Sequence, residues 1–368
     1  MPDPQHCRPN RVEIDTASVT RRVAALRRRV GRGVRIFATL KANGYGFGTL
    51  PMARAALDGG ANGLALIDRA EAIMLREEGI DTPILLYAGV PIDANAVAAA
   101  EQYRLTLTVL SEHEIDYIAA LARVPIELAI KLEVGSERIG VLPDELVAMA
   151  TRISQHRLLS LDIVNAHPTF RDDAPDTVVL EQFKRFLSAL QRLEQAGLPR
   201  PLRLFASSKT LGRLSGMELD AIDPGQYLFG DTTELPIIRS LTTVLTQVRE
   251  VSRDFAPDHA PFDIGKVRRV GVIPLGRVDG GGRCHATEAL VRGRRVPILG
   301  APSLEYMRLD LSEIGEAAAG DEVVLIGRQG HAQISLAEVC AAQSATPSDI
   351  AMAIGPAVFR NYQPGGGG

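Results

Sequence analysis

The chain of 368 residues has little cysteine, no long apolar run and no large excess of charge of either sign. Its three cysteines, Cys7, Cys284 and Cys340, are far apart, and this spacing indicates neither a disulfide framework nor a zinc site. No apolar run approaches the ~20 residues that a membrane helix requires, and Met1–Asn10 is too polar for a signal peptide. We therefore expect a cytoplasmic protein that has no membrane partner.

The formal net charge of −3 gives no electrostatic reason to expect a nucleic-acid partner, because such proteins carry a marked excess of basic residues. Apolar residues make up 46% of the chain. At this length, that share is enough for two domains with a large core. The composition therefore favours a two-domain globular protein.

Lysine is scarce, with only five among the 41 basic residues. Lys41 and Lys131 both lie in apolar runs that are typical of buried strands. A buried lysine is costly unless it is paired or used chemically. Its unprotonated amine can attack a carbonyl carbon and form a Schiff base, whereas the alternative is an ion pair at the rim of the fold.

Short apolar runs alternate with amphipathic segments from residue 34 to about residue 230. We expect strands at Val34–Leu40, Gly63–Ile67, Pro83–Tyr87, Leu105–Val109, Ile126–Leu132, Leu159–Val164, Leu202–Ala206 and Tyr227–Phe229. Eight such units predict a closed (β/α)8 barrel of the TIM type rather than an open sheet. Lys41, Lys131, His167 and Ser207–Ser208 follow strand ends, where such a barrel carries its catalytic residues.

The pattern changes after about residue 235. We expect further strands at Leu241–Val251, Arg268–Pro274, Glu288–Arg292, Met307–Leu311 and Glu322–Ile326, joined by glycine-rich turns. The predicted fold class is therefore α/β, with an N-terminal barrel followed by a mostly β C-terminal domain. We place the barrel at residues 12–235 and the β-rich domain at residues 1–11 and 236–368.

The segment Lys41–Gly48 reads Lys-Ala-Asn-Gly-Tyr-Gly-Phe-Gly, and it resembles the segment that carries the cofactor lysine in alanine racemases. A second segment, Asp321–Gly330, resembles their C-terminal domain, so the resemblance spans nearly the whole chain. The resemblance implies a pyridoxal 5'-phosphate (PLP) enzyme of fold-type III, in which Lys41 holds the cofactor as a Schiff base and Tyr45 binds its phosphate. It also implies that residues around 11–15 help to build the β domain.

The segment Lys131–Gly140 resembles the family pattern Lys-x-Asp-Thr-Gly-Met-x-Arg-x-Gly. This resemblance implies that Arg138 lies against the phenolic oxygen of the cofactor, with Lys131 beside it near the substrate, often as a carbamate. Glu133 departs from the pattern. The alternative for Lys131 is an ordinary salt bridge to Glu133 or Glu137.

The other cofactor-binding residues implied by the resemblance lie in three short motifs. His167, in Asn-Ala-His-Pro, matches the histidine that lies along the pyridine ring. Ser208, in Ala-Ser-Ser, matches a serine that binds the phosphate, and Gly225 and the N–H of Gln226 are expected to line the same site.

Two positions depart from the racemase pattern on the side of the reaction. Asp223 stands where racemases have an arginine that faces the pyridine nitrogen, and Asp-Pro-Gly resembles the Glu-Pro-Gly of the related amino-acid decarboxylases. A carboxylate there would favour a protonated ring nitrogen, whereas the alternative is a turn cap before Pro224. Arg277 replaces the catalytic tyrosine; arginine is a poor base but a strong partner for carboxylates.

These residues predict an enzyme that acts at the Cα of a small amino-acid substrate. The first interpretation is a racemase or epimerase other than a standard alanine racemase, with Lys41, Asp223 and Arg277 as catalytic residues. The alternatives are a one-base PLP lyase (an aldolase or a decarboxylase) and a PLP-binding protein without turnover. Tyr306, Cys284 and His285 are candidates for a second base.

The resemblance further implies a homodimer with shared active sites. In the family, the segments that correspond to Arg277 and Glu305 enter the barrel mouth of the partner subunit. We therefore expect Lys131, Arg277 and Glu305 to bind the substrate.

Overall fold

The computed structural model describes residues 8–89, 91–169, 175–230, 236–251, 262–263 and 265–364. The chain forms two compact units. The barrel unit comprises Thr20–Gly44 and Gly48–Leu228, and the β unit comprises Met1–Val19, Tyr45–Phe47 and Phe229–Gly368. Each unit is described by itself below.

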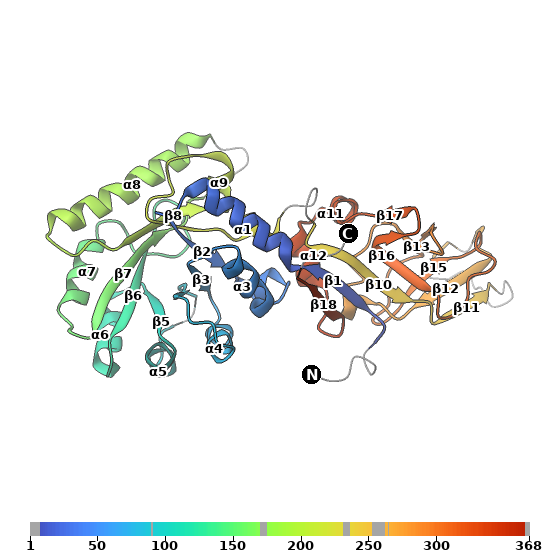
Figure 1. The fold of residues 1–368 in the computed structure, drawn as a ribbon, viewed down its shortest axis with the longest axis horizontal. Coiled ribbons are helices and arrows are strands. Elements are labelled where there is room, and N and C mark those ends of the chain that lie inside the picture. Colours follow the sequence, from blue (N-terminus) through green and yellow to red (C-terminus); the bar gives the residue numbers. More distant parts are fainter. Residues whose placement is uncertain are drawn as a thin grey trace. The chain divides into compact units, whose positions relative to one another are not determined.

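Parallel strands close into a barrel in the barrel unit, as the alternating sequence pattern predicts (Figure 1). In the described residues its eight strands are β2 (Arg35–Thr39), β3 (Gly63–Leu66), β4 (Ile84–Leu86), β5 (Leu105–Val109), β6 (Ile126–Leu132), β7 (Leu159–Ala166), β8 (Leu202–Ser207) and β9 (Ala221–Asp223). The first and last of them pair in parallel, with Arg35 opposite Ala221 and Ile36 opposite Ile222. The predicted TIM-like barrel is therefore confirmed.

The predicted eighth strand, Tyr227–Phe229, is wrong. The eighth strand is β9, which is only three residues long, and Gln226–Phe229 forms the short helix α10 instead. Pro224 and Gly225 separate the two elements, and the carbonyl of Gly225 accepts the N–H of Leu228 in the turn that opens α10. A strand this short has too few residues to show a periodic pattern.

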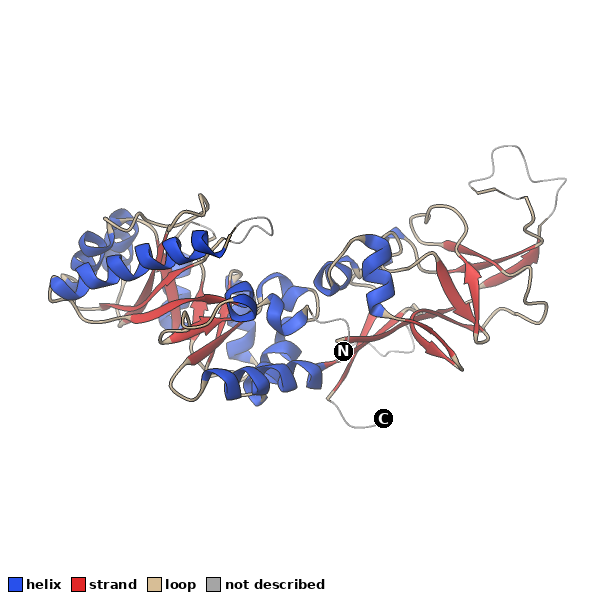
Figure 2. Ribbon diagram, turned by 90° about the horizontal axis from the view of Figure 1, so that it is seen from above, coloured by secondary structure: helices blue, strands red, loops and turns tan. Residues whose placement is uncertain are grey.

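Helices border the barrel strands, as the two colours in Figure 2 show. They are α1 (Thr16–Val30), α3 (Thr49–Asp58), α4 (Arg69–Glu77), α5 (Ala94–Tyr103), α6 (Glu112–Leu121), α7 (Leu146–Ser154), α8 (Asp176–Gln195) and α9 (Ser208–Arg213). Each long helix has an apolar face; in α8 this face includes Phe186 and Leu193, both fully buried. Inside the barrel, Phe37, Ala129 and Leu204 from different strands fill one buried layer.

Within the described residues, the β unit contains two sheets. In the part of the chain that the structure describes, its strands are β1 (Arg11–Asp15), β10 (Ile238–Val244), β11 (Gln247–Glu250), β12 (Arg269–Ile273), β13 (Glu288–Val291), β14 (Arg294–Pro297), β15 (Met307–Asp310), β16 (Glu322–Gln329), β17 (Ala332–Ile334) and β18 (Phe359–Gln363). Helices α11 (Leu336–Gln343) and α12 (Pro347–Ala353) complete it. The predicted mostly β character of this part is confirmed.

The N-terminal strand β1 lies inside the larger sheet, antiparallel to β10 and parallel to β18 (Figure 1). The single predicted strand Leu241–Val251 is wrong, because β10 ends at Val244 and β11 pairs with β12 in the smaller sheet. The chain therefore changes sheets between Val244 and Gln247.

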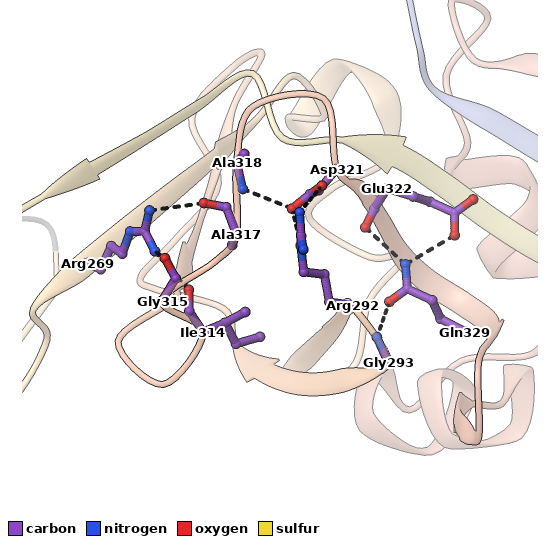
Figure 3. Close-up of polar contacts among 10 residues, drawn as sticks. All are labelled: Arg269, Arg292, Gly293, Ile314, Gly315, Ala317, Ala318, Asp321, Glu322 and Gln329. Atoms are coloured by element: carbon purple, nitrogen blue, oxygen red, sulfur yellow. Dashed lines mark hydrogen bonds and ion pairs between the residues drawn. The ribbon is translucent and has the colours of Figure 1, made fainter.

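Side chains hold the turns of the β unit by bonding to the main chain, as Figure 3 shows. The guanidinium of Arg269 donates to three carbonyl oxygens of the 314–317 turn. Arg292 donates two hydrogen bonds of 2.6 and 2.9 Å to Asp321, which also accepts the N–H of Ala318. These contacts fix the loops between strands at the edge of the unit.

Gly63, at the start of β3, has no room for a side chain. A Cβ at this position would lie 2.6 Å from the ring of Phe37 inside the barrel. We therefore expect Gly63→Ala to lower the free energy of unfolding by about 1–3 kcal/mol through overpacking. Gly33→Ala is the matched control, because no atom lies within 4 Å of its added Cβ. Denaturant unfolding measures both variants, and equal stabilities would contradict this account of the barrel core.

Candidate active site

Polar side chains from several strands meet at the carboxyl ends of the barrel strands. The register of β6 and β7 places Lys131 opposite Asn165, two residues before His167. The register of β8 and β9 places Ser207 opposite Asp223. Because parallel strands end at the same edge, residues far apart in the sequence come together at this barrel mouth.

Lys41 opens α2 (Lys41–Tyr45), a turn with unusual backbone geometry. Ala42, Asn43 and Gly44 are left-handed, with φ between 54° and 57°. Glu71 of α4 holds this turn, since its Oε1 accepts the N–H of Asn43 at 2.9 Å. The lysine is therefore presented by a backbone conformation that neighbouring elements stabilise.

The two lysines of the barrel mouth are easier to deprotonate than ordinary lysines. Burial lowers the pKa of Lys41; the Asp223 carboxylate opposes this shift and Arg138 adds to it. Burial also lowers the pKa of Lys131, to about 8, with Asp223 again opposing. Both shifts enlarge the fraction of neutral amine, which is the nucleophilic form.

Asp223 is a buried carboxylate, and only one of its two oxygens accepts a hydrogen bond from the described residues. Its Oδ2 accepts a hydrogen bond from the Tyr87 hydroxyl at 2.6 Å. Its Oδ1 is buried and bonds to none of the residues that the structure describes. Burial raises the pKa of Asp223 to about 6, against the hydrogen bond from Tyr87 and the attraction of Lys131 and Lys41. An unpartnered buried oxygen of this kind is suited to accept a hydrogen from a bound ligand.

Tyr87 and Thr39 are site residues that the sequence analysis missed. The Thr39 hydroxyl lies 3.2 Å from the Tyr87 hydroxyl and 3.2 Å from the carbonyl oxygen of Asp223. The sequence does contain a feature that could have identified Tyr87, because this residue closes an apolar run at a strand end, as Lys41 does.

The Ser208 hydroxyl organises the turn that precedes α10. Its Oγ accepts the N–H of Gly225 at 2.9 Å and the N–H of Tyr227 at 3.1 Å. Gln226 lies between these two residues and is exposed, whereas Gly225 is buried. Because the oxygen accepts both bonds, the hydroxyl hydrogen is available to donate to an anion.

Glu133 anchors the loop that carries Arg138. Its carboxylate accepts the backbone N–H groups of Gly135, Ser136 and Arg138. Although burial raises the pKa of Glu133, these bonds and that from the Ser136 hydroxyl hold it at about 2. The Glu133 oxygens are therefore used to shape the loop, which does not favour the simple salt bridge with Lys131.

His167 is a neutral ring in this setting. Burial lowers its pKa to about 3, and the positive charges of Lys131, Arg138 and Lys41 add to the shift. At physiological pH it therefore offers an uncharged imidazole to a flat ligand.

The structure places three of the predicted site residues in the β unit. Tyr45 packs its ring against that of Phe229, with centroids 5.1 Å apart. Arg277 is exposed and begins the short 3-10 helix η2 (Arg277–Asp279), and its N–H donates to the carbonyl of Ser303. Glu305 pairs with Arg8 at 3.4 Å.

The candidates for a second base differ in accessibility. Cys284 is fully buried, burial raises its pKa to about 12, and its thiol contacts the carbonyl oxygen of Ile350. It is therefore unsuited to accept a proton from a substrate. Tyr306 is 46% exposed, and its backbone carbonyl accepts the N–H of Ser303, whose own carbonyl accepts the N–H of Arg277.

Metal binding and membrane insertion have no visible basis in the described ranges. No group of three or more His, Cys, Asp or Glu side chains there could hold a metal ion. None of the helices in the same ranges is long and apolar enough to cross a membrane.

Comparisons with known proteins cover both units. Residues 14–233 match the N-terminal domain of alanine racemase, and residues 240–362 match its C-terminal domain. The chain is 32% identical over 346 residues to an alanine racemase of Synechocystis, covering 88% of this chain and 91% of that protein. It is 27% identical over 368 residues to alanine racemase 2 of Caldanaerobacter subterraneus, covering 96% and 95%.

Solved structures agree with these matches. The crystal structure of alanine racemase from Bacillus anthracis with bound L-Ala-P has a TM-score of 0.83 and 26% identity, over 97% of this chain and 95% of that one. Alanine racemase from Streptomyces coelicolor has a TM-score of 0.79 and 27% identity, over 96% and 98%. Together with the domain matches, these similarities show that the chain belongs to the alanine racemase family.

Proposed function

We propose that the barrel mouth holds pyridoxal 5'-phosphate, the cofactor that enzymes of this family use. The residues present fit it, since they include an amine with a lowered pKa, a hydroxyl free to donate to a phosphate, and a buried carboxylate oxygen without a partner. When bound, this cofactor withdraws electrons from the substrate and makes the bonds at Cα easier to break.

We assign cofactor-binding and catalytic roles to individual residues of the barrel mouth. Lys41 Nζ would hold the cofactor at its aldehyde carbon and would move a proton to and from Cα of the substrate. Ser208 Oγ would donate to the phosphate, next to Gly225 and Gln226, and the family resemblance adds Tyr45 as a further phosphate-binding residue. The proposal depends most on one observation: the Oδ1 atom of Asp223 is buried and has no hydrogen-bond partner among the described residues. This oxygen is suited to accept a hydrogen bond from the N–H of a protonated ring nitrogen.

The remaining barrel residues orient the ligand. Arg138 would donate hydrogen bonds to the phenolic oxygen of the cofactor, and the neutral ring of His167 would pack along its pyridine ring. Lys131, whose pKa burial lowers to about 8, would bind the substrate.

We propose an amino-acid racemase or epimerase whose chemistry differs from that of a standard alanine racemase. The family membership supports racemisation, whereas Asp223 and Arg277 differ from the family pattern at the ring nitrogen and at the second base. A one-base lyase, either an aldolase or a decarboxylase, is a second candidate, because Arg277 stays protonated and cannot accept a proton. The names of the relatives give this second candidate no support.

An amino-acid panel in deuterated water, followed by chiral product analysis, tests the function. We expect deuterium incorporation at Cα together with inversion for at least one amino acid, and no reaction with Lys41→Ala. Lys41→Ala should also lose the visible absorbance of the covalently bound cofactor. Lys184→Ala is the control, since Lys184 is exposed and pairs with Glu181 at 2.7 Å.

Two results of this panel would contradict the proposal. Cleavage of the substrate without inversion would favour the lyase. Retained cofactor absorbance in Lys41→Ala would move the Schiff base to another lysine, with Lys131 as the candidate.

We propose that Arg277 binds the carboxylate of the substrate. A guanidinium offers two parallel N–H donors to a carboxylate, and its loss should lower kcat/KM about 30- to 1,000-fold. Steady-state kinetics of Arg277→Ala measure this effect, with Arg268→Ala, an exposed arginine paired with Glu313, as the control. An unchanged kcat/KM would remove Arg277 from the site. Arg277→Tyr restores the family residue and is expected to create or increase racemisation of alanine.

We propose a homodimer in which the loops around Arg277 reach the barrel mouth of the partner subunit. The two loops at Arg277 and Ser303 carry exposed apolar side chains: Val278 is 42% exposed, Leu304 57% and Tyr306 46%. The backbone N–H groups of Arg277 and Val278 donate to the carbonyls of Ser303 and Leu304, respectively. These bonds hold the two loops side by side, so that their exposed side chains form one patch. Side chains of this kind are typical of an interface that a partner covers.

Leu304→Asp is expected to convert the dimer into a monomer and to remove activity, because a charge would be buried in the interface. Light scattering at micromolar concentration measures the mass. Leu142→Asp is the control, since Leu142 is 60% exposed and lies in the barrel unit. A wild-type protein that is monomeric and fully active would contradict the shared site.

A further inference from the structure

Asp223 is held through one of its two oxygens. The Tyr87 hydroxyl donates to Oδ2 at 2.6 Å, whereas Oδ1 is buried and bonds to no residue in the described ranges. Tyr87 directly follows β4, and Asp223 ends β9. A side chain from another part of the barrel thus occupies one carboxylate oxygen and leaves the other for a ligand.

Thr39, which ends β2, supports this arrangement from a third strand. Its hydroxyl lies 3.2 Å from the Tyr87 hydroxyl and 3.2 Å from the carbonyl oxygen of Asp223. Tyr87 has a single hydroxyl hydrogen, which it gives to Asp223. The Thr39 hydrogen is therefore the one shared between Tyr87 and the Asp223 carbonyl.

We propose that Tyr87, steadied by Thr39, is a positioning residue that keeps Asp223 ionised and keeps its Oδ1 available for the ring nitrogen of the cofactor. The inference rests on the proposed function, in which Asp223 faces that nitrogen. Nothing in the sequence resemblance assigns a role to Tyr87 or Thr39.

The electrostatics of the site show why Asp223 needs a hydrogen-bond donor. A buried carboxylate tends to take up a proton, and burial raises the pKa of Asp223 to about 6. The Tyr87 hydrogen bond opposes this shift most, followed by the charges of Lys131 and Lys41. A hydrogen bond to the ionised form stabilises that form, so the proton shared with the ring nitrogen stays on the nitrogen.

Removal of the Tyr87 hydroxyl should move that proton toward Asp223. The transfer is balanced, because the ring nitrogen loses the hydrogen that Oδ1 gains and no other bond changes. A neutral ring nitrogen is a weaker electron acceptor. We therefore expect kcat of Tyr87→Phe to fall about 10- to 100-fold with KM nearly unchanged, the effect of one hydrogen bond to a charged group.

The direct measurement is the 15N resonance of holoenzyme reconstituted with cofactor that is 15N-labelled at the ring nitrogen. We expect a protonated nitrogen in the wild type, and a shift toward the neutral position in Tyr87→Phe. Thr39→Val should give a smaller shift in the same direction. Tyr103→Phe is the matched control, because Tyr103 also donates to a carboxylate, that of Glu77, at 3.3 Å on the exposed side of the barrel.

The variant Asp223→Asn shows whether a negative result contradicts only the role of Tyr87 or also the proposed role of Asp223. If Asp223→Asn loses the protonated resonance while Tyr87→Phe and Thr39→Val keep it, Tyr87 has no positioning role and the proposed function stands. If Asp223→Asn itself keeps the wild-type resonance, Asp223 does not face the nitrogen and both proposals fail. Lower thermal stability of Tyr87→Phe without a change in the resonance would show a merely structural contact and overturn the inference.

Discussion

The pairing of β2 with β9 closes the barrel, and the candidate site depends on this closure. Ile36 of β2 pairs with Ile222 of β9. Beyond this pair, the Thr39 N–H donates to the carbonyl of Pro224 at 2.9 Å and extends the contact between the two strands. The lysine that follows the first strand and the aspartate that ends the last strand are thereby brought to the same edge. An open sheet would leave these two strands at opposite edges, and the attraction between Lys41 and Asp223 would be lost.

Positive charge exceeds negative charge in the barrel mouth. Lys41, Lys131 and Arg138 lie there with Asp223. Burial, to which the repulsion among these cations adds, lowers the pKa values of both lysines and of His167. An anionic ligand relieves this repulsion, because its charge offsets that of the cations in a partly desolvated site. A phosphorylated cofactor and a substrate carboxylate are both ligands of this kind.

Much of the architecture could be predicted from the sequence, because buried parallel strands form continuous apolar runs such as Leu105–Val109. The prediction failed at β9, whose three residues are too few for a pattern, and at β10 and β11, where the chain changes sheets without an obvious break. Motifs named Lys41 and Asp223 as site residues. Tyr87 was missed although it closes an apolar run at a strand end, because its hydrogen bond to Asp223 joins two strands that are far apart in the sequence.

The left-handed turn after Lys41 makes the position of this lysine depend on a helix elsewhere in the barrel. Left-handed dihedrals at residues other than glycine are unfavourable by roughly 1–2 kcal/mol each, so the series Ala42, Asn43 and Tyr45 is disfavoured in an isolated chain. The contact that compensates comes from Glu71, which belongs to a helix formed later in the sequence. The geometry that presents Lys41 therefore depends on the packing of α4, and a substitution at Glu71 would remove a contact of this turn without changing the lysine itself.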